Sequence, residues 1–261
     1  LIRYIDDVKP TVGNISILMI ESMDADKIAL RRKVADALAR LVRQNYVSHA
    51  GDTYQFLTNE EQDIAREIKN TTVDTANIVD RIKKIIFDDM FTQKKVRVGA
   101  NDFPFDRYVD ESVHGTAQGG MRLDIITLAN TLAQSGPEAL PLNSTGCALV
   151  LLADDGDYFE VLENAAKITK YTQTKSVHHL PESTQAIIRA KQKEANAADR
   201  QAREMIERSI IEATVAVDGR LEDVRATNAK DKLEKTLQLL VGAVYTQANL
   251  VGAPVKGEED I

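Results

Sequence analysis

Hydrophobic residues over the first 70 positions follow a helical period, then an alternating one, then a helical one again. Between residues 24 and 44, five apolar side chains fall near one helical face. They are Ile28, Val34, Leu38, Leu41 and Val42. Asp24 is the expected N-cap of this helix, because its carboxylate can accept from the free amides of the first turn.

The segment YVSHAGDTYQFLT alternates apolar and polar residues on either side of a tight turn at Ala50-Gly51-Asp52. This pattern predicts a β-hairpin. Thr58 is followed three residues later by Glu61, the spacing of a capping box at the start of the next helix. Helices followed by a hairpin have the order of a winged helix, so we predict a winged-helix-like domain over residues 1–70.

A second helical stripe occupies the stretch that follows. Its members are Ile78, Ile82, Ile85, Ile86 and Met90. We predict a connector helix over residues 71–92 that packs on both of its neighbours.

From residue 93 the apolar runs become short and are broken by Gly, Asn and Pro, which predicts strands. The run CALVLLADD, which begins at Cys147, is typical of a strand buried on both faces, and a helical pattern follows it. Asp218-Gly219 predicts the turn of a second hairpin, and an amphipathic helix comes after it. These patterns predict an α+β domain over residues 93–261 that ends in a hairpin and a helix.

A stretch without glycine predicts a long helix over about residues 182–213. Its stripe is thin and rich in alanine: Ile187, Ala195, Ala198, Ala202, Met205, Ile206 and Ile210. Alanine buries far less apolar area than leucine, so we predict a protruding helix or one arm of a helical hairpin. The fold class is therefore α+β: a winged-helix domain, a connector helix, and a mixed α+β domain with this protruding Ala-rich helix.

Composition changes this picture mainly by what it excludes. The 261 residues carry a net charge of −7, so whole-chain attraction to nucleic acid or to an acidic membrane is not indicated. Cys147 is the only cysteine, which excludes a disulfide framework and fits a reducing cytoplasm. No apolar run approaches the roughly 20 residues needed to span a bilayer. The chain begins at Leu1 within what reads as ongoing structure, so we expect a fragment of a longer protein.

No pattern of catalytic, cofactor-binding or metal-binding residues emerges. The sequence contains no GxxxxGK[ST] run, the loop that cradles nucleotide phosphates. The Gly-rich stretch HGTAQGG at 114–120 is not followed by a helical pattern and is interpreted as a surface loop. His178-His179 lacks the carboxylate or HExxH frame of a metal site and is interpreted as exposed loop.

The best binding candidate is the polar face of the helix over 24–44. Basic side chains there could meet phosphates, with the hairpin flanking them. The candidate residues are Arg32, Lys33, Arg40, Arg43 and, near the hairpin tip, His49. Asp36 interrupts this face and Asp52 opposes close approach of a phosphate backbone at the tip. A solvated charged face or a protein-docking surface is the alternative interpretation.

Three stretches, YQFLTNEEQDIAREIKN, IIFDDMFTQKKVRV and LPESTQAIIRAKQKEA, resemble the large P-loop protein of bacterial BREX phage-resistance systems, the BrxC/PglY type. The resemblance runs along most of the chain but rests on no catalytic motif. It implies a bacterial cytoplasmic protein with an AAA-like ATPase region that acts beside other BREX components. It also implies ATP and Mg²⁺ as cofactors of the parent protein, and no nucleotide-site residue of this chain can be assigned from it.

Two hypotheses of function follow. In the first, the chain is a non-catalytic DNA- or protein-interaction segment of a BREX ATP-binding protein, with no cofactor of its own. In the second, it is a winged-helix transcriptional regulator with a C-terminal regulatory domain. The DNA backbone and other BREX components are the candidate partners, a membrane is not, and self-association is left open.

Overall fold

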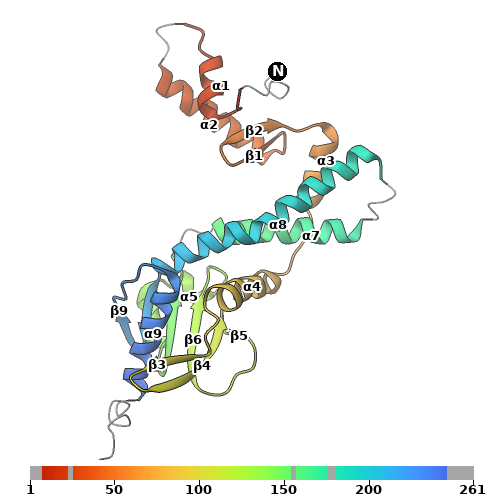
Figure 1. Cartoon of the computed structure of the whole chain (residues 1–261). Coiled ribbons are helices and arrows are strands. Elements are labelled where there is room, and N and C mark those ends of the chain that lie inside the picture. The colour runs from red at the N-terminus through yellow and green to blue at the C-terminus, as the bar shows by residue number, and fades with distance from the viewer. Residues whose placement is uncertain (1–7, 23–25, 154–156, 176–179, 246–261) are drawn as a thin grey trace, which may run out of the picture. The chain divides into compact units, whose positions relative to one another are not determined.

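The computed structural model describes residues 8–22, 26–153, 157–175 and 180–245 (Figure 1). The chain divides into two compact units. The first comprises residues 1–72 and 167–192, and the second comprises residues 73–166 and 193–261. Two of the three boundaries fall within long helices and the third falls between residues 72 and 73, and each unit is described by itself.

The first unit begins with two helices and a hairpin, followed by a third helix. Val34, Leu38 and Val47 form its small core, against which Ile15 and Tyr54 pack. The hairpin pairs Val47 with Phe56 and Ala50 with Thr53, so the turn predicted at Ala50-Gly51-Asp52 is confirmed, with Ala50 as the last residue of the strand. The elements are α1 (Val12–Leu18), α2 (Lys27–Arg43), β1 (Val47–Ala50), β2 (Thr53–Phe56) and α3 (Asn59–Lys69).

Side-chain caps set where these helices begin. The capping box of α3 is confirmed: Thr58 Oγ1 accepts from the Glu61 N–H at 3.2 Å and Glu61 Oε2 accepts from the Thr58 N–H at 2.6 Å. The N-cap of α2 is Asp26, whose Oδ1 accepts from two first-turn amides, both at 3.0 Å. Asp24, the predicted cap, lies outside the described residues.

The prediction that Ile28 belongs to the buried stripe of α2 is wrong. Its side chain is 84% exposed, whereas Val34 is 5% exposed. Ile28 lies six residues before Val34, which at 3.6 residues per turn places it about 120° around the helix. Leu30 takes the inward position instead.

The second unit begins with α4 (Thr75–Lys84), which continues directly into a π-helix, η2 (Ile85–Met90). The predicted stripe is confirmed as buried from Ile78 to Ile86, and Met90 packs against it. The π turn carries Phe87 and Phe91 into the core. Arg107 Nη1 donates to the carbonyl of Phe87 at 3.2 Å. This hydrogen bond gives the carbonyl oxygen, which lies on the widened π turn, a partner.

A mixed seven-stranded sheet organises the second unit. Its order is β3-β4-β6-β7-β8-β9, with the two-residue β5 pairing β4 from outside this path. β4, β6 and β7 are parallel to one another, and the remaining pairs are antiparallel. The strands are β3 (Lys95–Val98), β4 (Asn101–Val109), β5 (Ser112–Val113), β6 (Met121–Ile126), β7 (Cys147–Leu151), β8 (Thr214–Val217) and β9 (Arg220–Glu222). The α+β class is therefore confirmed.

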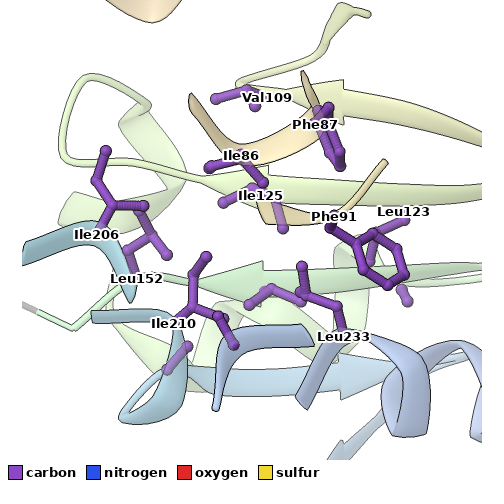
Figure 2. Close-up of a cluster of buried hydrophobic side chains, with 14 of the residues drawn as sticks. Ile86, Phe87, Phe91, Val109, Leu123, Ile125, Leu152, Ile206, Ile210 and Leu233 are labelled. Carbon is purple, nitrogen blue, oxygen red and sulfur yellow. The ribbon is translucent and has the colours of Figure 1, made fainter. Parts of the chain in front are cut away.

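Alternating residues of the central strands pack into two different clusters, as the two-residue period of a strand requires. Leu123 and Ile125 of β6 join the larger core with side chains from η2 and the helices (Figure 2). Ile126 joins a smaller cluster with Leu140. Three short elements follow β6: α5 (Thr131–Gln134), η3 (Pro137–Ala139) and α6 (Leu140–Asn143). Leu132 and Ala133 of α5 and Leu140 of α6 belong to this smaller cluster.

Three long helices complete the chain: α7 (Asp157–Thr174), α8 (Glu182–Ile211) and α9 (Ala229–Val244). The predicted continuity of α8 is confirmed over 30 residues. Its alanine stripe is buried, with Ala202 fully so, and Ile206 and Ile210 belong to the larger core. Within the second unit, residues 193–211 of α8 therefore pack into the core and do not protrude from it, because small side chains let neighbouring elements approach closely. No helix in the described part of the chain is long and apolar enough to cross a membrane.

Candidate functional site

The four predicted cations of α2 lie together on the side of the helix that faces away from its core. Val34 and Leu38 point into the first unit, whereas Arg32, Lys33, Arg40 and Arg43 are all exposed. Six basic residues and one acidic residue, Asp36, lie in this 17-residue helix. The 3.6-residue period thus collects positive charge on one face even though the whole chain is acidic.

These cations are free to meet a ligand. Among the residues that the structure describes, no ion pair involves any of the four. Arg40 and Arg43 occupy the last turn of α2, where the negative end of the helix dipole favours positive charge. The helix dipole therefore stabilises these two cations without an acidic partner from the described residues.

His49 lies on the hairpin, one register position before the turn, rather than at its tip. Its ring stacks on that of Tyr54, with centroids 4.3 Å apart and planes 18° from parallel. The turn itself is formed by Gly51-Asp52. His49 is exposed, so the stack fixes an aromatic edge at the surface of the hairpin. The structure thus places four candidate residues on one helix face and the fifth on the hairpin.

Sequence reasoning missed a groove on the flank of α2. It has a volume of about 580 Å³. Val12 of α1 and five residues of α2 line it: Lys27, Ile28, Arg31, Arg32 and Ala35. The available signal was the spacing of Ile28, Arg31 and Ala35, which share one side of a helix at intervals of three and four.

A second polar cluster, also missed, lies where β4 and β6 end. Asp110 accepts from Thr127 twice, from the backbone N–H at 2.7 Å and from the hydroxyl at 2.5 Å. Asp124 is fully buried and forms an ion pair with Arg122, whose guanidinium lies 4.3 Å from the ring centroid of Tyr108. Burial raises the pKa of both Asp110 and Asp124, while the Arg122 guanidinium partly offsets the rise at Asp124. These partners give the carboxylates a structural role.

The Gly-rich stretch at 114–120 wraps an internal carboxylate. Asp106 accepts backbone N–H groups from Gln118 at 2.7 Å, Gly119 at 2.9 Å and Gly120 at 3.3 Å. Successive amides of this kind form an anion-binding nest, and here the protein's own side chain fills it. The loop is therefore a structural element and not a phosphate cradle.

The described part of the chain offers little support for a metal site or a catalytic nucleophile. It contains no group of three or more His, Cys, Asp or Glu residues that could hold a metal ion. Burial raises the pKa of the Cys147 thiol, which disfavours the nucleophilic thiolate. His178-His179 lies outside the described residues.

The fold thus defines an α+β protein built on a mixed sheet, preceded by a helix-hairpin unit with a basic surface. Residues 71–240 match a family model described as "BREX ATP-binding protein BrxC 4th domain with six-stranded beta sheet". The match spans more than half of the chain, so this chain belongs to the BrxC family and is a segment of a BREX phage-resistance protein. The resemblance inferred from the sequence is confirmed, and the transcriptional-regulator alternative is not favoured.

The matched range agrees with the observed sheet. All six strands on the path from β3 to β9 lie within residues 71–240, whereas α1, α2 and the first hairpin precede it. No solved structure matches the chain.

Proposed function

We propose that this chain is a non-catalytic interaction segment of a BREX ATP-binding protein, and that its first unit is a winged-helix-like module that contacts DNA. The observation that carries the proposal is the row of exposed cations on α2, without ion-pair partners among the described residues and directly before a hairpin. The order helix, helix, hairpin supports the winged-helix interpretation.

The chemistry of this face suits contact with DNA phosphates. Guanidinium and ammonium groups bind phosphate oxygens without regard to sequence. Asp36 lies between the cations and repels phosphate, which limits the strength of binding. We therefore expect weak, sequence-tolerant binding that depends steeply on salt.

Fluorescence anisotropy with a labelled DNA duplex at several salt concentrations tests this proposal. Four phosphate contacts give a slope of about −3.6 in log affinity against log salt, and two contacts give about −1.8. The double variant Arg40→Ala, Arg43→Ala should bind more weakly, with the shallower slope. Neither residue lies in the core, so the fold should be kept.

A matched control is available on α8. Arg200 and Arg203 have the same spacing on a helix and are also exposed. Arg200→Ala, Arg203→Ala should bind like wild type. Equal curves for all three proteins would refute the DNA contact. The basic face would then be a candidate docking surface for another BREX component.

We further propose that the chain has no nucleotide site of its own, and that ATP and Mg²⁺ act in another part of the parent protein. The motivation is the absence of a phosphate-binding loop from the sequence. Isothermal calorimetry of the 261-residue chain with MgATP should show no heat of binding. Saturable, magnesium-dependent binding in the micromolar range would contradict this.

A further inference from the structure

The groove between α1 and α2 combines an exposed apolar floor with a basic rim. Ile28 is 84% exposed, although isoleucine is among the residues most often buried. It lines the groove together with Val12 and Ala35. At the end of α1, three more apolar residues are exposed: Ile17 at 65%, Leu18 at 63% and Met19 at 54%. So much apolar surface on one small unit is typical of an interaction site.

Lys27, Arg31 and Arg32 supply the charge of the rim. Among the described residues, none of the three forms an ion pair. Asp26, next to Lys27, accepts from the Ile28 and Ala29 amides as the N-cap. Asp36 lies four residues after Arg32 but forms no ion pair with it among the described residues. The rim therefore keeps a net positive charge.

We propose that this groove binds an acidic amphipathic segment of another polypeptide chain. Apolar side chains of that segment cover Ile28 and Val12, and its carboxylates pair with Lys27, Arg31 and Arg32. A DNA backbone would satisfy the cations but would leave Ile28 in water, whereas an amphipathic helix satisfies both. The proposal goes beyond DNA contact: the groove shares Arg32 with the DNA-contacting cations, but Lys27, Ile28 and Arg31 lie on a different flank of α2 from Arg40 and Arg43.

A synthetic helical peptide of about 14 residues tests the proposal, made of Glu and Leu with the Leu residues at intervals of three and four. Labelled with fluorescein, it should bind the 261-residue chain with a Kd in the range of roughly 10–100 μM. A peptide of the same composition with the Leu residues scrambled off one stripe should bind roughly tenfold more weakly. Equal binding of both peptides would overturn the apolar part of the proposal.

Substitutions then locate the binding site. Ile28→Asp should weaken binding roughly tenfold or more, since a central apolar anchor is lost and a like charge is added. Leu142→Asp is the matched control, because Leu142 is 86% exposed and lies on α6 of the second unit. Both residues are exposed, so neither change should unfold the protein. An Ile28→Asp variant that binds like Leu142→Asp would refute the assignment.

Charge reversal separates this groove from the DNA-binding face. Lys27→Glu, Arg31→Glu should lose the acidic peptide and gain binding of a peptide with Lys in place of Glu. Arg40→Ala, Arg43→Ala should keep the acidic peptide even if it loses DNA. Loss of the peptide from that second double variant, to the same degree as from Ile28→Asp, would show that the groove is not the site. The two proposals can therefore fail independently.

Discussion

The ion pair between Arg122 and Asp124 offers a sharp test of how the sheet of the second unit is stabilised. The Asp124 side chain is 0% exposed, and that of Arg122 is 37% exposed. Arg122→Met keeps much of the side-chain length but removes the positive charge. Among the described residues, the carboxylate then keeps only the Glu111 N–H at 3.4 Å, a long hydrogen bond. Removing one partner of a buried pair costs about 3–5 kcal/mol, because the other charge stays buried without compensation.

Urea unfolding followed by circular dichroism measures this cost. For m-values of about 2–3 kcal/mol/M, the midpoint of Arg122→Met should fall by roughly 1.5 M. Arg97→Met is the control: Arg97 forms an exposed pair with Asp102 at 3.7 Å, and such pairs contribute less than about 1 kcal/mol. Adding Asp124→Asn to Arg122→Met should restore about 2 kcal/mol, because a neutral amide replaces the unpaired charge.

The pH dependence supplies an independent check. Burial raises the pKa of Asp124, and loss of the guanidinium lets that pKa rise further. A carboxyl with a raised folded-state pKa contributes stability below its unfolded pKa, and this contribution is lost as pH rises through the folded pKa. The stability gap between Arg122→Met and wild type should therefore narrow as pH falls. A gap below about 1 kcal/mol at neutral pH, or one that widens in acid, would refute this reasoning.

Two further predictions concern hydrogen bonds that tie distant segments together. Asp106→Ala leaves three loop amides without their acceptor, so we expect the free energy of unfolding in urea to fall by about 1–3 kcal/mol. An unchanged urea midpoint would contradict a stabilising role for these three hydrogen bonds. Burial and the Glu67 carboxylate raise the pKa of Tyr171 to about 12. The protonated Tyr171 hydroxyl should therefore contribute fully to the free energy of unfolding below pH 10, and this contribution should be lost between pH 10 and about 12. Ultraviolet difference titration of wild type and Glu67→Gln should show that one tyrosine ionises at a lower pH in the variant. An identical titration would exclude the contact.

Local patterns predicted most elements of the fold correctly. The capping box at Thr58, the turn at Asp218-Gly219 and the stripe from Ile78 to Ile86 all depend on residues a few positions apart. The π-helix at 85–90 was not predicted, because its apolar residues fit an ordinary helical period. The exposure of the four cations on α2 could be predicted in the same way as the buried apolar stripes, because both follow from the period of a single helix.

Contacts between residues that lie far apart in the sequence could be found only from the tertiary structure. Asp106 meets the amides of 118–120 only because β4 and β6 lie side by side in parallel. The groove beside Ile28 depends on where Val12 of α1 packs against α2, although the outward position of Ile28 itself follows from its spacing to Val34. The sequence by itself determined the elements, the basic helix face and the family, because these are encoded in spacing along the chain. The tertiary structure alone decided which charges are buried, where α1 forms a groove with α2 and which loop holds a carboxylate, because those outcomes depend on strand order and packing.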